Sequence, residues 1–299
     1  IPTGEWEQDP DCTSAIISPD PLHRGIILIE NGEAVVRKID VVFPVVMGKH
    51  GADGTIQGLL DLSGIPYVGC GVLAAASCMD KSHIHMVMDD YDIATAEWRI
   101  ITQREISEID ERCQEIAGEL GFPLIVKPAK SGTSAGTGKA DDLAQLIAAV
   151  KVAFSNDNKV VVEKYVSGRK MEAAVFGYDT PFSTYIGEIL DPDRVYDPTE
   201  VNQSTGDGLK IPADISDELQ ASIRETAVKA YKAMGCKGLA RLDFFLTDGV
   251  RLRLNKIGTS PGLRKNSVFP KLMEHMGISH EDFVDMLLEQ AIDNAERTY

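Results

Sequence analysis

The apolar and polar positions of the N-terminal part follow the order strand, loop, helix, strand. The segment IDVVFPVV (39–46) is almost wholly apolar, which predicts a strand buried on both faces of a parallel sheet. A glycine-rich loop, MGKHGADG (47–54), follows it, and the apolar residues of TIQGLLDLSG (55–64) recur at helical spacing up to a glycine stop. A second short strand is expected in IPYVGCG (65–71). This order is typical of an α/β domain whose ligand loop lies at the carboxyl end of a strand.

The middle of the chain changes from a parallel to an antiparallel pattern. Helical spacing predicts three helices, at residues 72–90, 105–120 and 143–154, the last opened by Asp141. An apolar strand, FPLIVKP (122–128), leads into a loop rich in Gly, Ser and Thr. The segment 159–179 predicts two strands joined by a turn at residues 167–168.

The C-terminal part combines a long loop, a hairpin and helices. Residues 180–215 contain several prolines and predict one short strand, YIGEIL, followed by a loop of the length that functional lids have. A hairpin is expected at 240–258, turned by Asp248 and Gly249, between a helix at 216–234 and a last helix. The last helix is expected to begin at a capping box and to end near Arg297; the box is formed by Ser279 and Asp282.

Composition and charge exclude several classes of function. The formal net charge of −16 and the lack of a basic cluster argue against nonspecific nucleic-acid binding. No apolar run approaches the roughly 18 to 20 residues that cross a bilayer, and the first residues do not form a secretory signal. The five cysteines are scattered, without CxxC spacing, which favours reduced thiols in the cytoplasm over disulfides or a zinc site.

One loop has the composition of a phosphate-binding site. In KPAKSGTSAGTGK (127–139) small residues let backbone N–H groups approach an anion, and Lys127 at a strand end can place an ammonium beside phosphate oxygens. An ordinary flexible loop is the alternative. Neither a GxxxxGK[ST] loop nor a GxGxxG turn between a strand and a helix is present.

Three histidines and one pair of opposite charges are the other candidate site residues. His83 and His85 lie on different faces of a helix, so a shared metal ion is not expected, and His50 in a glycine-rich loop is the better candidate for ligand contact. Arg241 and Asp243 point to the same side of a strand, either as a structural ion pair or as part of a site.

The order of the motifs carries a family resemblance. The sequence MGKHGADGTIQGLLDLSGIPYVGCGVLAAASCMDK is followed by GFPLIVKPAKSGTSAGTGK, VVVEKYVSGR, GCKGLARLDFFLTDG, LNKIGTSPGL and SVFPKL. From about residue 4 to its end, the chain resembles the D-alanine:D-alanine ligases, including the vancomycin-resistance D-Ala:D-Lac and D-Ala:D-Ser ligases, of the ATP-grasp superfamily. The resemblance implies an α/β (α+β) ATP-grasp fold.

The resemblance also implies a division into three parts. Residues 1–78 are expected to form a substrate-side domain with a parallel sheet, and we expect the first strand and Gly-rich loop of that domain to be missing. Residues 79–167 are expected to form the central ATP-grasp subdomain. Residues 168–299 are expected to form the C-terminal subdomain, which carries the metal and substrate hairpin.

The resemblance further implies roles for individual residues. Three residues are implied to be catalytic. Arg241 would orient the tetrahedral intermediate, Ser267 would contact the acceptor, and Gly262 would donate a backbone N–H. Binding of ATP is implied for Lys81, Lys127, Ser131, Gly132, Thr133, Ser134, Gly136, Glu163, Lys164 and Val166. Binding of Mg²⁺ is implied for Asp243.

Other positions depart from the family pattern. Lys256 and Gly258 stand where the family has a Glu that bridges two magnesium ions and an Asn that completes the second. Replacing a bridging carboxylate by an ammonium inverts the local electrostatics of a magnesium site. Four more positions lack the family's substrate or ATP contacts; these are Met47, Ala52, Lys170 and Val201.

We therefore expect an ATP-dependent, cytoplasmic protein whose ligase chemistry is impaired or lost. The family joins a D-amino acid to a D-amino or D-hydroxy acid through an acyl phosphate, for peptidoglycan precursors. Two alternatives stay open: an active carboxylate:amine ligase with a rebuilt site, and a non-catalytic nucleotide-binding or partner protein. The expected partners are small-molecule D-amino acids and a second copy in a homodimer, without nucleic acid or membrane.

Overall fold

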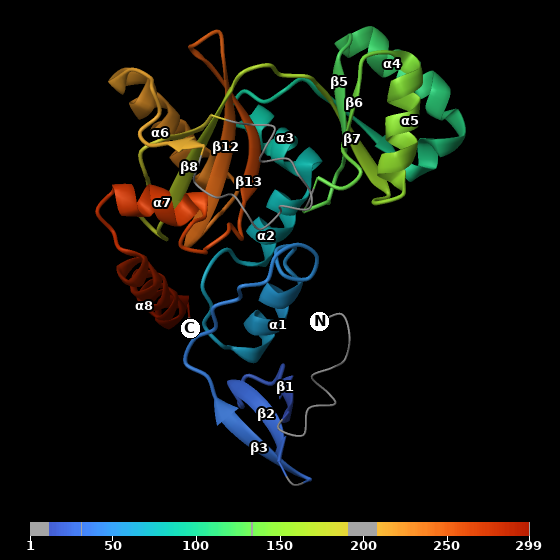
Figure 1. Cartoon of the computed structure of the whole chain (residues 1–299). Helices are drawn as coiled ribbons and strands as arrows, with labels where there is room; N and C mark the ends of the chain where they lie inside the picture. Colours follow the sequence, from blue (N-terminus) through green and yellow to red (C-terminus); the bar gives the residue numbers. More distant parts are fainter. Residues whose placement is uncertain (1–11, 31, 133, 191–207, 299) are drawn as a thin grey trace.

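The computed structural model describes residues 12–30, 32–132, 134–190 and 208–298. Within these ranges, three β-sheets, of three, four and six strands, are arranged with helices packed against them (Figure 1). All pairings between the named strands are antiparallel. The mixed α/β class predicted from the sequence is confirmed.

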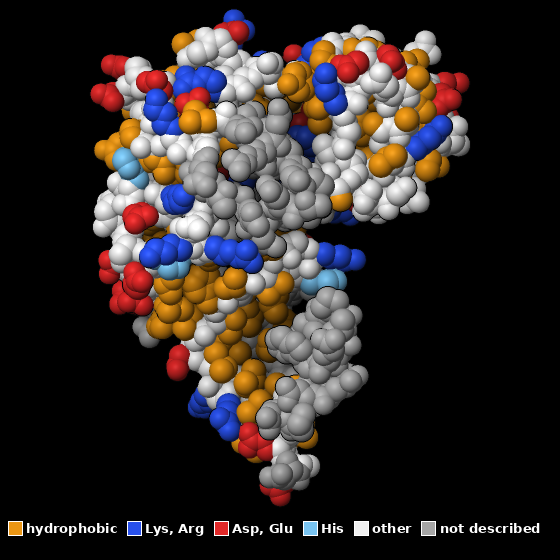
Figure 2. All heavy atoms as spheres, viewed as in Figure 1, with side chains coloured by type: hydrophobic (Ala, Val, Ile, Leu, Met, Phe, Trp, Pro, Cys, Tyr) orange, Lys and Arg blue, Asp and Glu red, His pale blue; other side chains and the backbone are white. Residues whose placement is uncertain are grey.

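The three-stranded sheet lies at the lower, N-terminal end of the molecule in Figure 1. Its strands are β1 (Ser14–Ile17), β2 (Gly25–Glu30) and β3 (Glu33–Lys38). Every residue of β3 is exposed, and Figure 2 shows hydrophobic side chains gathered over this end of the molecule. The helix predicted at residues 55–64 is present as α1 (Thr55–Ser63), and Gly64 ends it with a φ of 65°.

The buried parallel strand predicted at residues 39–46 is wrong. The segment makes one isolated parallel bridge, between Val42 and Tyr67, and Val45 is 69% exposed. Pro44 has no N–H with which to continue a ladder. The strand expected at 65–71 is reduced to the same bridge, so within the described ranges the N-terminal part contains no parallel sheet.

The four-stranded sheet has the order β4-β7-β5-β6. Its strands are β4 (Trp98–Thr102), β5 (Leu124–Pro128), β6 (Gly138–Ala140) and β7 (Lys159–Lys164). Two helices pack on one face, α4 (Ile109–Leu120) and α5 (Leu143–Phe154). The helix predicted at 105–120 begins as the 3₁₀ turn η2 (Gln103–Glu108), and α5 is capped by Asp142 rather than by the expected Asp141.

The six-stranded sheet has the order β11-β10-β8-β12-β13, with β9 attached to β8. Its strands are β8 (Arg169–Phe176), β9 (Phe182–Ser183), β10 (Gly187–Ile189), β11 (Leu209–Lys210), β12 (Leu239–Thr247) and β13 (Arg251–Gly258). β7 and β8 do not pair as a hairpin, because they belong to different sheets. The turn at residues 167–168 instead connects the two sheets.

Alternate residues of the six-stranded sheet enter two separate cores. Met171, Leu242 and Phe244 pack with α3 (Lys81–Asp90) and α6 (Asp217–Ala233) on one face. On the other face, Ala174 and Phe176 pack with α7 (Val268–His275) and α8 (His280–Thr298). These two helices cover only one end of that face, and the other end carries charged residues.

The remaining helix predictions are confirmed with changes at the ends. The helix expected at 72–90 is divided at Asp80 into α2 (Val72–Met79) and α3, and the Asp80 side chain accepts a hydrogen bond from the backbone N–H of Ser82. The helices expected at 216–234 and from residue 279 are α6 and α8. The Ser279 hydroxyl accepts from the backbone N–H of Asp282, as a cap should.

The predicted hairpin is confirmed, and it contains a β-bulge that the sequence did not indicate. Asp248 and Gly249 both have positive φ (52° and 73°), as a tight hairpin turn requires. The register pairs Asp243 with Lys256 but Phe244 with Leu254, so Asn255 is the extra residue. Leu254 and Ile257 therefore enter the same core, and Lys256 lies on the opposite face.

Two predictions about organisation are not decided by the fold. The domain boundaries at 78/79 and 167/168 stay predictions, although the change of sheet between β7 and β8 falls at the second boundary. Most of the predicted long loop (residues 191–207) lies outside the described residues.

No helix in the described part of the chain combines the length and apolarity that a bilayer crossing requires.

Candidate functional site

The uncovered faces of the two larger sheets meet at a charged site. Lys127 on β5 and Glu163 on β7 point away from the α4/α5 core, and their side chains form a 2.6 Å ion pair. The Lys127 ammonium also donates to the side-chain oxygen of Asn255, at 3.2 Å, across to the other sheet. The bulge therefore aims Asn255 at Lys127 and ties the sheets together.

Glu163 is buried at the centre of this network. Its second carboxylate oxygen lies 3.1 Å from Nε2 of His85, whose Nδ1 lies 2.8 Å from the Thr95 hydroxyl. Burial alone would raise the pKa of Glu163, but the charge of Lys127 and the hydrogen bond with His85 outweigh it and lower the pKa to about 2. His85 also stacks on Trp98 at 4.9 Å between ring centroids.

Lys81, at the start of α3, reaches the segment that follows β5. Its ammonium donates to the carbonyl oxygens of Pro128 (3.0 Å) and Ser131 (2.9 Å). Burial lowers the pKa of Lys81 to about 8, with further lowering from the charges of Lys127 and Lys256. The three lysines are therefore close enough for each charge to be felt at Lys81.

The predicted phosphate loop lies beside the glycine-rich loop at 47–54. A Cβ on Gly132 would come within 3.2 Å of the Cα of Gly48. At Gly136, which has a φ of 77°, a Cβ would meet the side chain of Asn156 at 2.6 Å. A side chain at position 136 would therefore be both strained and crowded, and the approach of an anion to this loop stays a prediction. Ser134 lies in this loop, and Thr133 lies outside the described residues.

Arg241 and Asp243 lie together on the uncovered face of β12. The guanidinium donates to both carboxylate oxygens of Asp243, at 2.8 Å each, and its Nε lies 3.3 Å from Glu172 on β8. Burial raises the pKa of Glu172 to about 7 against the opposing charge of Arg241. Its Oε2 is buried without a hydrogen bond from any described residue. The shared side predicted for Arg241 and Asp243 is confirmed.

Lys256 stands directly opposite Asp243 in the register, and Gly258 stands opposite Arg241. The Lys256 ammonium makes no hydrogen bond or ion pair with the described residues. The surrounding protein lowers its pKa by desolvation, and the charge of Asp243 opposes that shift. Beside Asp243, where a metal ion would need a second carboxylate, this face of the sheet therefore carries the ammonium of Lys256.

The donor set does not fit Mg²⁺. Both oxygens of Asp243 are held by Arg241, and the neighbouring carboxyl of Glu172 lies 3.3 Å from the same guanidinium with its pKa raised to about 7. Lys256 is a cation, and Gly258 has no side chain. Magnesium needs hard oxygen ligands in near-octahedral geometry. No cluster of three or more His, Cys, Asp or Glu side chains suited to a metal ion occurs within the ranges that the structure describes.

Two other residues with an implied catalytic role lie in contact after the hairpin. A Cβ on Gly262 would come within 2.9 Å of the Ser267 hydroxyl, and Ser267 is buried at the start of α7. The turn before them touches the N-terminal part, because the Ser260 hydroxyl donates to the carbonyl of Val46 at 3.2 Å. No described contact joins Gly262 or Ser267 to Arg241.

The roles implied for the remaining positions stay predictions, and the structure gives only their surroundings. The Lys164 ammonium donates to the carbonyls of Gly121 and Phe122, and Val166 is half-buried. Met47 is exposed and Ala52 half-buried in the glycine-rich loop, and Lys170 lies on β8 opposite Phe245. Val201 lies outside the described residues.

Sequence reasoning missed Glu172 and Asn255. Glu172 could have been found as the carboxylate within the otherwise apolar half of RKMEAAVF, where burial demands a partner. Asn255 had no such signal, because its direction depends on the bulge. Thr95 and Trp98 were missed for a similar reason, since they matter only through His85.

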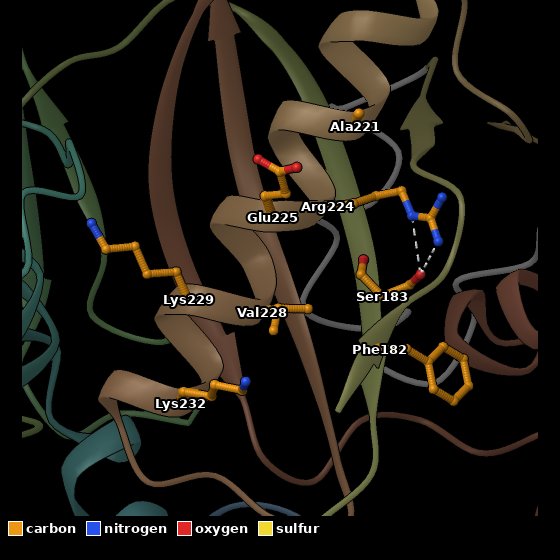
Figure 3. A pocket seen from close by; sticks show the side chains of 8 residues that line it. All are labelled: Phe182, Ser183, Ala221, Arg224, Glu225, Val228, Lys229 and Lys232. Atoms are coloured by element: carbon orange, nitrogen blue, oxygen red, sulfur yellow. Dashed lines mark hydrogen bonds between the residues drawn. The ribbon is translucent and has the colours of Figure 1, made fainter. Parts of the chain in front are cut away.

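A separate hollow of about 590 Å³ lies on the other side of the six-stranded sheet, between α6 and β9 (Figure 3). Figure 3 shows Arg224 turned toward Ser183, whose carbonyl oxygen accepts from the guanidinium at 2.9 and 3.1 Å. Lys229 extends from α6 away from this contact. None of the residues with an implied role lines this hollow.

Comparison with known families matches both parts of the chain. The family described as "D-ala D-ala ligase N-terminus" matches residues 6–70, and the one described as "D-ala D-ala ligase C-terminus" matches residues 87–289.

Individual relatives match over nearly the whole chain. The D-alanine–D-alanine ligase of Acetivibrio thermocellus is 39% identical, over 98% of this chain and 81% of the relative. The vancomycin/teicoplanin A-type resistance protein VanA of Enterococcus faecium is 38% identical, over 97% of this chain and 84% of the relative. The crystal structure of the VanG D-Ala:D-Ser ligase from Enterococcus faecalis is similar with a TM-score of 0.85 at 32% identity, covering 96% of this chain and 82% of that one.

Proposed function

The chain belongs to the D-alanine:D-alanine ligase family, whose ATP-grasp fold it has, and from this premise we propose that it retains the family's nucleotide pocket with impaired ligase turnover. The family reaction is ATP-dependent, so ATP is the nucleotide to expect. The substrates would be a D-amino acid and a D-amino or D-hydroxy acid. A cytoplasmic location and a homodimer stay predictions.

The proposed nucleotide pocket is supported by the cationic and glycine-rich surfaces described above. The ammonium group of Lys81 contacts this loop at the carbonyl of Ser131, and Lys127 lies at the start of the loop. Gly132 and Gly136 have no side chain that would hinder an anion from approaching their backbone N–H groups. Glu163 and Lys164 lie on the strand proposed to run along the adenine. These residues fit ATP, which when bound would supply the phosphoryl group.

The proposed impairment is supported by one observation: Lys256 faces Asp243, whose carboxylate is fully engaged by Arg241. Phosphoryl transfer depends on cations that neutralise charge on the equatorial oxygens while aligning donor and acceptor. An ammonium can neutralise part of that charge. It cannot coordinate oxygens from both the protein and two phosphates as a metal ion does.

Phosphate release tests the proposal. We expect the unaltered chain, given D-alanine, ATP and Mg²⁺, to release little phosphate above a reaction without D-alanine. The double variant Lys256→Glu with Gly258→Asn is expected to raise release at least about tenfold, because it supplies two oxygen ligands beside Asp243. Rapid release by the unaltered chain would contradict the impairment.

The same experiment distinguishes the rebuilt-site alternative. The observation in its favour is that the Lys256 side chain is exposed and its ammonium has no hydrogen-bond or ion-pair partner among the described residues. Release should then be measured with a panel of other carboxylic acids and amines. Turnover by the unaltered chain with any such pair, lost in Lys256→Glu, would replace impairment by a changed substrate. Met47 and Ala52 would be the next positions to restore if the double variant remains inactive.

A further inference from the structure

Four cationic side chains surround the proposed phosphate region, and two of them lack a carboxylate partner. Lys127 is paired with Glu163, and Arg241 is paired with Asp243. Within the described residues, neither Lys81 nor Lys256 lies within ion-pair distance of a carboxylate. Glu172 lies 3.3 Å from Arg241 as a third carboxyl group. The four cationic side chains therefore outnumber the three carboxyl groups of the region, Glu163, Glu172 and Asp243.

The position of Lys256 follows from the bulge at Asn255. Strict alternation would place Lys256 on the same face as Leu254, in the core with α3 and α6. The extra residue reverses the direction, so Lys256 shares the uncovered face with Asp243. The same extra residue directs Asn255 to Lys127, which brings Lys256 beside the four-stranded sheet. In Figure 1, β13 is the strand of its sheet that lies next to α3.

We propose that this chain binds the triphosphate of a nucleotide without a divalent cation, with the ammonium of Lys256 contacting phosphate oxygens directly. The inference deepens the proposed function and rests on the nucleotide pocket proposed there. Charge-assisted hydrogen bonds between lysine and phosphate are strong and tolerate several geometries. Lys81 and Lys256 supply the charge that a metal ion would otherwise bring.

The residues around Asp243 are a poor match for a bound complex of magnesium and nucleotide. A metal–nucleotide complex brings its own positive charge to the protein and is best received by carboxylates. Here the same complex would meet the ammonium of Lys256 and an Asp243 already engaged by Arg241. The nucleotide without metal carries more negative charge and suits the cationic region better.

Calorimetric titration of the full chain with ATP, in excess EDTA and in Mg²⁺, tests the inference. We expect ATP to bind in EDTA at least as tightly as in Mg²⁺. Lys256→Gln should weaken binding in EDTA by about tenfold or more, because a charge-assisted contact is lost. Lys229→Gln is the matched control: it removes one ammonium from the exposed side of α6 and should leave binding unchanged. Lys256→Arg keeps the charge and should remain within about threefold of the unaltered chain.

A charge reversal gives the sharpest result. Lys256→Glu should lose binding in EDTA and recover it when Mg²⁺ is added, because the new carboxylate can hold a metal ion beside the phosphates. Thermal melting of each variant confirms that folding is retained.

Three results would overturn the inference. ATP binding by the unaltered chain only with Mg²⁺ would overturn it and leave the proposed function intact. Unchanged affinity of the folded Lys256→Gln protein in EDTA would remove Lys256 from the phosphate site. No ATP binding in either buffer would overturn the proposed nucleotide pocket together with this inference.

Discussion

Replacing Glu163 by glutamine is expected to lower the free energy of unfolding by about 3 to 5 kcal/mol at neutral pH, because it leaves a partly buried ammonium without its counter-charge. Glu163 is 6% exposed, and its carboxylate holds Lys127 at 2.6 Å and His85 at 3.1 Å. Glutamine keeps the size of the side chain, so the loss reports charge rather than volume. Urea unfolding followed by circular dichroism measures the change.

The pH dependence of this loss has a definite sign. The pKa of Glu163 falls from its usual 4.5 to about 2 in the folded protein, so its carboxylate contributes fully above about pH 4.5. The contribution is lost as the pH falls from there toward 2. The difference between the unaltered chain and Glu163→Gln should therefore stay constant from pH 7 to about pH 5 and shrink below it.

Two controls separate this effect from a general effect of removing an acid. Glu119→Gln breaks the exposed ion pair with Arg99 and should cost less than about 1 kcal/mol. Adding Lys127→Met to Glu163→Gln should recover part of the loss, because no unpaired charge then remains. A loss below about 1 kcal/mol in Glu163→Gln alone would mean that the network contributes little to stability.

Replacing Phe283 by alanine is expected to lower the free energy of unfolding by about 3 to 5 kcal/mol. Phe283 is fully buried on α8, with ring centroids 5.8 Å from Phe176 on β8 and 5.4 Å from Phe269 on α7. The cavity would lie where α7 and α8 cover one end of the six-stranded sheet. Thermal and urea unfolding measure the change.

The matched control is Glu289→Ala, which lies exposed on the same helix and should change stability by less than about 0.5 kcal/mol. ATP binding by Phe283→Ala, measured well below its melting temperature, should stay close to that of the unaltered chain. The cavity would lie in the core with α7 and α8, whereas Lys81 lies on α3 and Lys127 on β5 of the four-stranded sheet. Equal stability of Phe283→Ala and the control would show that α8 is not anchored by this side chain.

The errors of sequence reasoning have physical causes that can be named. The apolar segment 39–46 has the composition of a buried strand, but a strand exists only where a partner supplies the ladder, and here one bridge is all that forms. The two strands predicted at 159–179 are both present, but the sequence did not indicate their partners: β7 pairs with β4 and β5, whereas β8 pairs with β9, β10 and β12. Which strands pair over long sequence separations depends on how whole helices and strands pack together. The local pattern of apolar residues does not contain that information.

The motif positions were more reliable than the packing. The turn at Asp248 and Gly249 and the shared side of Arg241 and Asp243 depend on local chemistry, and each is readable from its own segment. The roles implied by the family resemblance stay predictions until the variants above are measured.

By itself, the sequence determined that an ammonium and a glycine occupy positions 256 and 258 at the end of a hairpin strand. It also determined the family, because the motifs that carry the resemblance are consecutive along the chain. Only the tertiary structure decided which way Lys256 points. Strict alternation puts it into the core, whereas the bulge at Asn255 lets Leu254 and Ile257 both remain buried and turns Lys256 toward Asp243. The helices packed on one face of the sheet bury both Leu254 and Ile257 there. That burial places the ammonium of Lys256 on the opposite face, in the site.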